Sequence, residues 1–289
     1  MAQPDLEDLV ASTGKLATLP GTVVDLLYLL DDPVSGTEDV RKIIERDPAM
    51  TANVLKLGNS AFYGVDREIT CVRDALVYLG NRCVAALSFA SGMAPIMRQE
   101  LSGYSLTRHE FWNHSLITGA ASSEALRQVG EPQLCSEAFT AGLVHDIGML
   151  VINPWLDQNG IVLKTEGPLF GVCRLEQAEL GFDHCQAGAL LAKSWGFPKS
   201  LVDPIARHHM TEFGDHESPV TRGVAAGNIM AEYLDLDMDQ PTTGKYPKIG
   251  ECLTQLGYSH DLLEKVRLDL TTDLEKTLVR ATSSSPVEV

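Results

Sequence analysis

The residues with the clearest potential for chemistry are histidines, one of which directly precedes an aspartate. His145-Asp146 lies inside the apolar run GLVHDIGML. Further histidines that could act with this pair are His114, His184 and His208-His209. Imidazole nitrogen combined with a bridging carboxylate suits Fe, Mn, Zn or Ni better than Mg or Ca. The pattern permits a centre of one or two divalent ions, which could serve two-metal hydrolysis.

Taken singly, each of these histidines is better explained as a packed or solvated residue. Together they occur in separate predicted helices, and helix bundles build metal sites from such residues. Adjacent residues on a helix do not share a face. His145 and Asp146 could therefore hold one ion only in a notch or near a helix end. The small residues Ala141, Gly142 and Gly148 would permit the close approach of another helix or of an ion.

The elements that must position these residues have a helical period almost throughout. The sequence predicts an all-α fold of two packed helical lobes: an N-terminal lobe over 1–100 and a second lobe over 101–240. Residues 241–289 are predicted to form a C-terminal helix, over 259–279, and a polar tail. Within the second lobe, 132–152 is predicted as one helix that contains the His-Asp pair, and 153–171 as an irregular stretch.

Composition excludes several classes of function. The net charge of −16 over 289 residues, with no basic cluster, argues against nucleic-acid binding. The N-terminus lacks the apolar core of a secretory signal, and no apolar run of membrane-spanning length is evident. The six cysteines are dispersed with no CxxC pair, which suggests reduced thiols, mostly in the core. We expect a cytoplasmic protein that does not bind membranes.

Several longer blocks resemble the HDOD domain, the HD-related output domain of bacterial signalling proteins. The most recognisable block is RDPAMTANVLKLGNSAFYG, and the resemblance continues through FWNHS, AGLVHDIGMLV, LGFDHCQAGALLAKSWGFP and ARHH, from about residue 16 to about residue 230. HDOD members generally lack demonstrated enzyme activity. The resemblance implies a regulatory module with a signalling protein as partner, and a nucleotide-like molecule as an alternative ligand.

The histidines also resemble those of the related HD and HD-GYP metal-dependent phosphohydrolases, which implies that the lobe over 101–240 is HD-like. That resemblance implies that His114, His145 and Asp146 hold one metal. It implies that a second metal is held by His184, His208 and His209, with Asp146 bridging the two.

The sequence departs from the active HD-GYP pattern at three places. Asn228 stands where the closing aspartate is expected, Met149 replaces the lysine after HDIG, and the GYP motif is absent after the His pair. Three hypotheses remain: a non-catalytic signalling module, a metal site used only for binding, and a phosphohydrolase or cyclic dinucleotide phosphodiesterase. The departures favour the first.

The segment GNSAFYG has two readings. Asn59 and Ser60 can satisfy backbone groups at the turn after Gly58, which is a structural role. Alternatively, the segment could bind a partner through Asn59, Ser60, Phe62 and Tyr63. The structural reading is the favoured one.

Overall fold

The structure is a computed structural model that describes residues 3–16, 19–31, 36–59, 67–164, 170–214, 216–235 and 247–258. In these ranges the ordered elements are helices, and extended residues pair only in an isolated bridge between Leu101 and Leu106. The predicted all-α class is confirmed. The chain divides into two compact units: Pro20 to Met93 lies in one, and α1 together with the described residues from Ala94 onward lies in the other.

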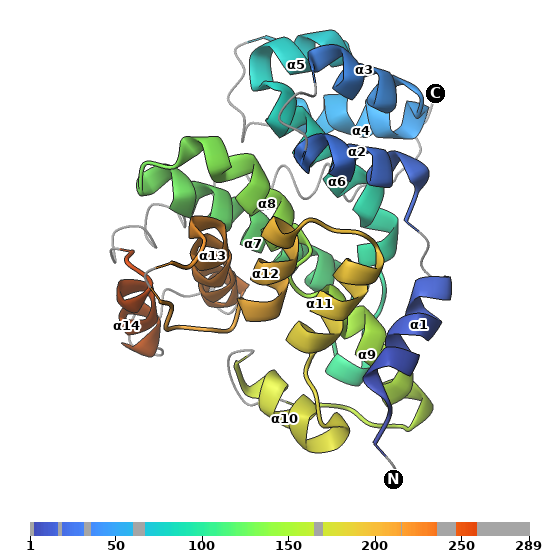
Figure 1. Ribbon diagram of the computed structural model, residues 1–289, viewed down its shortest axis with the longest axis vertical. Coiled ribbons are helices and arrows are strands. Elements are labelled where there is room, and N and C mark those ends of the chain that lie inside the picture. Colours follow the sequence, from blue (N-terminus) through green and yellow to red (C-terminus); the bar gives the residue numbers. More distant parts are fainter. Residues whose placement is uncertain are drawn as a thin grey trace. The chain divides into compact units, whose positions relative to one another are not determined.

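The described residues of the smaller unit form helices α2 to α6, coloured blue to teal in Figure 1. They are α2 (Gly21–Asp31), α3 (Thr37–Glu45), α4 (Pro48–Gly58), α5 (Val72–Leu79) and α6 (Asn81–Met97). Asp47 Oδ1 accepts hydrogen bonds from the backbone N–H groups of Ala49 (2.9 Å) and Met50 (3.0 Å). Asp47 therefore caps α4, and Pro48 takes the first helical position, where its missing N–H costs nothing.

The boundary between the units differs from the sequence-based one. It falls within α6, at Met93–Ala94, instead of near residue 100. Helix α1 (Leu6–Leu16) belongs to the larger unit, where it packs on α9 and α11. The predicted lobe over 1–100 thus loses its first helix. Periodicity shows that this helix has an apolar face, but it does not identify the neighbour that covers that face.

The larger unit is centred on three helices that approach closely: α7 (Arg108–Gln128), α8 (Cys135–Leu143) and α13 (Pro219–Asp235). Thr107 and Glu110 form a capping box at the start of α7. A Cβ added at Gly142 would lie 2.8 Å from the Cα of Gly119, across the α7–α8 contact. Glycine at both positions lets the backbones of α7 and α8 meet. This contact holds α7, the first helix with a candidate histidine, against the end of α8.

The predicted helix over 132–152 is broken at its centre. The chain forms a 3₁₀ turn over Pro132–Leu134, then α8, and after Val144–Asp146 it forms α9 (Ile147–Gln158). Asp146 occupies the N-cap position of α9, with φ −96° and ψ 14°. Helix α9 continues to Gln158, so the irregular stretch predicted from residue 153 was wrong over its first six positions.

One stretch of the described residues, Pro132–Gln158, is long and apolar enough to cross a membrane, with mean hydropathy 1.3. The sequence-based expectation of no such run was therefore too strict. Of its most apolar window, 83% is buried inside the structure. The stretch is also divided between α8 and α9, as in the core of a globular unit.

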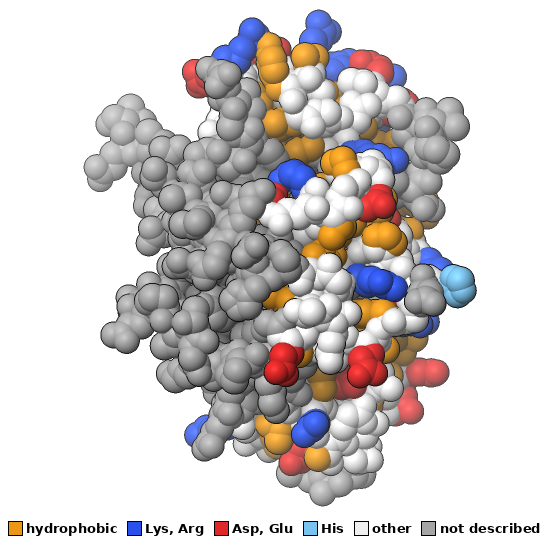
Figure 2. All heavy atoms as spheres, turned by 90° about the vertical axis from the view of Figure 1, so that its left-hand side faces the viewer, with side chains coloured by type: hydrophobic (Ala, Val, Ile, Leu, Met, Phe, Trp, Pro, Cys, Tyr) orange, Lys and Arg blue, Asp and Glu red, His pale blue; other side chains and the backbone are white. Residues whose placement is uncertain are grey.

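The remaining helices of the larger unit complete the surroundings of that core. They are α10 (Phe170–Leu180), α11 (His184–Ser194), α12 (Lys199–Arg207) and α14 (Pro247–Gln255). The helix predicted over 259–279 and the polar tail lie outside the described residues. On the face shown in Figure 2, basic side chains are scattered among acidic, apolar and neutral ones.

Candidate metal centre

The side chain of Asp146 lies between four imidazoles. Its Oδ2 atom is 3.0 Å from His145 Nε2 and 3.6 Å from His114 Nε2. Its Oδ1 atom is 3.2 Å from His208 Nε2 and 3.3 Å from His184 Nε2. Each carboxylate oxygen thus faces a different pair of histidines, as expected of a carboxylate that can bridge two ions.

The two other residues implied by the resemblance also reach this cluster. His184 Nε2 lies 3.1 Å from the Nε2 atoms of both His208 and His209. His114 Nε2 lies 3.1 Å from Asn228 Oδ1. Two ligands each about 2.1 Å from one ion are roughly 3.0–3.4 Å apart, depending on the coordination geometry. The separations of 3.0–3.3 Å therefore match those of atoms that share an ion, and the His114–Asp146 separation of 3.6 Å is slightly longer.

The histidine tautomers offer a direct test of whether metal fits. The Nδ1–H of His145 donates to the Gly142 carbonyl (2.7 Å), and that of His208 donates to the Ile205 carbonyl (2.9 Å). Because a carbonyl only accepts, each neutral ring presents an Nε2 lone pair to the cluster. His145 Nε2 and Asp146 Oδ1 are buried, and their short contacts with Asp146 Oδ2, His184 Nε2 and His208 Nε2 lack hydrogen-bond geometry in the described part of the chain. These residues fit a divalent metal.

The electrostatics favour neutral imidazoles at His145 and His209 beside an ionised Asp146 carboxylate. Burial lowers the pKa of His145 to about 4 and that of His209 to about 4. Burial alone would raise the pKa of Asp146, but His145, His184 and His208 together outweigh it and hold that pKa well below its usual range. A metal requires unprotonated imidazole and carboxylate, so this charge state suits metal binding.

Two local features bring the ligands together. The helix break at Val144–Asp146 turns His145 and Asp146 toward the same point, which a continuous helix would prevent. Gly148, in the first turn of α9, lies against the start of α11, where an added Cβ would be 1.9 Å from the His184 carbonyl oxygen. The close approach of α11 places His184 beside Asp146.

Glu176 of α10 is a candidate site residue that sequence reasoning missed. This fully buried carboxylate accepts hydrogen bonds from His184 Nδ1 (2.7 Å), the His184 backbone N–H (3.0 Å) and the Tyr104 hydroxyl (2.6 Å). Burial lowers the pKa of His184, but Glu176 and further partners outweigh it, and the pKa lies well above its usual value. A carboxylate behind a ligand histidine fixes ring and tautomer. Only the packing of α10 on α11 reveals this role.

Replacing Glu176 with glutamine should weaken metal binding through His184. Loss of such an outer carboxylate typically lowers metal affinity about 10–100-fold. The measurement is the dissociation constant for Mn²⁺ from a titration against a chelator of known affinity. Glu179→Gln is the matched control, because Glu179 is exposed on the same helix. Equal affinities in the two variants would contradict a positioning role for Glu176.

Two cysteines also touch the ligand histidines, although the sequence suggested only core positions for them. Cys173 Sγ lies 4.0 Å from His184 Nδ1, and Cys185 Sγ lies 3.8 Å from His208 Nε2. A hydrogen bond from Cys185 lowers the pKa of the Cys173 thiol, and bonds from His184 and His209 lower it further. No CxxC spacing marks this pair.

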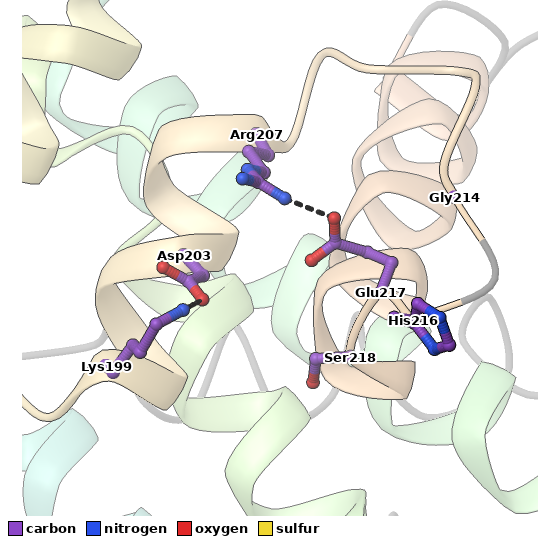
Figure 3. A pocket seen from close by; sticks show the side chains of 7 residues that line it. All are labelled: Lys199, Asp203, Arg207, Gly214, His216, Glu217 and Ser218. Carbon is purple, nitrogen blue, oxygen red and sulfur yellow. Dashed lines mark hydrogen bonds and ion pairs between the residues drawn. The ribbon is translucent and has the colours of Figure 1, made fainter.

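A surface hollow of about 420 Å³ lies along α12, from its first residue to its last (Figure 3). It is lined by Lys199, Asp203, Arg207, Gly214, His216, Glu217 and Ser218. The Lys199 ammonium pairs with Asp203, and the Arg207 guanidinium pairs with Glu217. Because both cations are neutralised by carboxylates, this hollow is a poor site for a phosphate group.

The predicted partner-binding segment is described only at Asn59. Its side chain donates to the Ile69 carbonyl (2.8 Å) and accepts from the Ile69 backbone N–H (2.7 Å). These bonds join the end of α4 to the residues before α5, which is a structural role. Ser60, Phe62 and Tyr63 lie outside the described residues.

Comparisons with known proteins agree with this architecture. A protein of Treponema pallidum (strain Nichols), described as uncharacterized, is 23% identical over 220 residues; these cover 75% of this chain and 42% of the relative's length. An HDOD domain protein of unknown function from Geobacter sulfurreducens has TM-score 0.69 and 22% identity, with 96% of this chain and 99% of that one covered. A provisionally named phosphohydrolase from Shewanella amazonensis SB2B has TM-score 0.71 and 24% identity, with 96% and 98% covered.

A provisionally named signal transduction protein from Marinobacter aquaeolei VT8 has TM-score 0.67 and 20% identity. The match covers 97% of this chain and 61% of that one. At these identities the solved structures show a shared fold. The model of the HDOD domain family matches residues 16–211, well over half of the chain. With the helical architecture and the histidine–aspartate cluster, this match shows that the chain belongs to the HDOD domain family.

Proposed function

We propose that this HDOD chain is a signal-transduction module whose HD-type centre binds divalent metal without hydrolysing phosphodiesters. One observation carries the proposal: Asp146 and the four histidines that contact it are at most 6% exposed. Phosphodiester hydrolysis requires an open metal position that a large anion can reach. Ligands this deeply buried suit a centre that organises the helices around it.

The groups that stand beside the ligands also favour binding over catalysis. Met149 is fully buried and apolar, so it offers no charge to a transferring phosphoryl group. Loss of one such transition-state contact costs about 100-fold or more in rate. Asn228 is a neutral and weaker ligand than the aspartate of active relatives. A bound divalent ion would supply positive charge beside Asp146 and stabilise the folded unit by mass action.

The ion would be Fe, Mn, Zn or Ni, bound at one or both sides of Asp146. The signal would pass to a protein partner, with a nucleotide-like ligand as the alternative. We place this role in the cytoplasm, without a membrane as a partner. The net charge of −16 argues against nucleic acid as a partner.

Hydrolysis is the second candidate, and the bridging position of Asp146 is the observation that favours it. We expect no turnover of cyclic dinucleotides or simple phosphodiesters above that of the metal in buffer. The assay loads the protein with Mn²⁺ or Fe²⁺ under reducing conditions and follows product formation by chromatography. Turnover that disappears in Asp146→Ala would establish the hydrolase and overturn the non-catalytic proposal.

A further inference from the structure

A group of four side chains on one side of the centre combines sulfur with nitrogen. One ligand atom from each of Cys173, His184, Cys185 and His209 lies within 4.8 Å of the others. Cys185 is 7% exposed, and Cys173, on α10, is half-buried. His184 and His209 are also two of the histidines assigned above to the second metal position. Two cysteines and two histidines form a ligand set typical of tetrahedral zinc.

The two cysteines differ from a cysteine that only packs. Cys135 is also buried, but its thiol donates to the Ser123 carbonyl (3.1 Å), which satisfies it locally. Cys173 instead lies beside the ring of His184, at the Nδ1 atom that also bonds Glu176, and Cys185 lies beside His208 Nε2, which faces the centre. They come from two different helices, α10 and α11, so their meeting depends on the packing of the unit.

Charge gives an independent argument for thiolate ligands. Asp146 supplies one negative charge between the histidines, and Glu176 supplies a second behind His184. Two divalent ions would bring twice that amount of positive charge into a buried site, where uncompensated charge is costly. Two thiolates would supply the remaining two negative charges. The two thiolates would therefore balance the positive charge of a second ion. Asn228 does not contribute to this balance, because its side chain is neutral.

We propose that Cys173 and Cys185, with His184 and His209, bind a thiophilic divalent ion such as Zn²⁺ at the second position. This inference rests on the metal-binding function proposed above and specifies the metal class and the ligands. Binding converts both thiols to thiolates and releases two protons to solvent, with no change of oxidation state. Ions that prefer oxygen, such as Mn²⁺, use Asp146 and His208 at this position instead.

The decisive measurement is the absorption spectrum of the full chain loaded with Co²⁺. Metal-free, reduced protein is titrated with Co²⁺ under anaerobic conditions. Bound Co²⁺ gives visible d–d bands with any ligand set, whereas thiolate ligands add a charge-transfer band in the near ultraviolet. We expect both. The double variant Cys173→Ser/Cys185→Ser should lose the charge-transfer band and keep visible absorption from Co²⁺ on the histidines.

Three controls separate the outcomes. Cys71→Ser should keep the full spectrum, because Cys71 lies in the other unit and serine can replace it as the cap of α5. The single variant Cys173→Ser, at the more exposed position, should lose part of the band even if the double variant fails to fold. Visible bands without a charge-transfer band in the unaltered chain would refute thiolate ligation but leave the metal centre intact. No Co²⁺ absorption would refute both proposals.

Metal selectivity gives a second readout. The Zn²⁺ affinity of the double variant should fall at least about 10-fold. Loss of a residue that only supports a metal ligand already costs about 10–100-fold, and loss of a ligand should cost no less. Its Mn²⁺ affinity should stay within twofold of that of the unaltered chain. Equal losses for both metals would mean that the cysteines support the fold of the site without binding the ion, which would overturn the proposal.

Discussion

Replacing Asp146 with alanine is expected to abolish the thermal stabilisation that divalent metal gives to this protein. Asp146 contacts His114, His145, His184 and His208 at 3.0–3.6 Å, and it would be the ligand shared by both proposed metal positions. An ion present at 100 times its dissociation constant stabilises the folded state by about 2.7 kcal/mol. For a unit of this size, that corresponds to about 5–10 °C in melting temperature. The variant should melt at the same temperature with and without metal.

The measurement is a pair of melting curves, recorded in chelator and in Mn²⁺, with metal content determined on protein purified without a nickel column. Asp146→Asn preserves the shape of the side chain and removes only its charge, so it separates loss of the ligand from loss of packing. Asp203→Ala serves as a control, because Asp203 pairs with Lys199 on the surface. If Asp146→Ala keeps its bound metal and its metal-dependent shift, the centre is not organised around this carboxylate.

Replacing Gly148 with alanine should produce the largest loss of stability from a single methyl group. The added Cβ would lie 1.9 Å from the His184 carbonyl oxygen and 2.6 Å from the Gly188 backbone nitrogen. Both are backbone atoms and cannot rotate away, so α9 and α11 must separate. Overpacking of this kind costs about 1–3 kcal/mol and occasionally more. Because α11 carries His184, metal affinity should fall with stability.

Chemical denaturation of the metal-free protein measures the first effect, and a Mn²⁺ titration measures the second. Gly21→Ala is the matched control: Gly21 begins α2, and a Cβ there meets nothing within 4 Å. Glycine to alanine at a compatible site stabilises by about 0.4–1 kcal/mol, so the two variants should shift stability in opposite directions. A neutral Gly148→Ala would show that α9 and α11 do not pack this closely.

The local signals of helix formation were readable from the sequence. Asp47 before Pro48 predicted the start of α4, and the structure has both residues in those roles. The membership of α1 was not readable, because an apolar face does not specify its partner. The break at Val144–Asp146 was also hidden, since the apolar run continues through it. The local bond from His145 Nδ1 to the Gly142 carbonyl and the tertiary contacts of Asp146 with His184 and His208 stabilise that break.

The candidate centre was also only partly predictable from the sequence. The adjacent pair His145-Asp146 and the order of the other histidines identified which residues to examine, through their resemblance to a family. Their convergence depends on how α7, α9, α11, α12 and α13 pack, which spacing alone does not specify. Glu176 is an example of a residue that the sequence did not identify. It precedes His184 by eight residues and lies on a different helix, so its carboxylate meets the His184 imidazole only when α10 packs on α11.

The ligands of the centre are dispersed along the chain from His114 to Asn228, and this order has a consequence for synthesis. As the polypeptide emerges from the ribosome, His114, His145 and Asp146 appear first, and the second group is complete only after residue 209. Contacts this far apart in sequence form late in folding. Once the helices close, the ligands are buried, and exchange of an ion requires local opening of the unit. The metal supply at the moment of folding would therefore decide which ion each molecule carries.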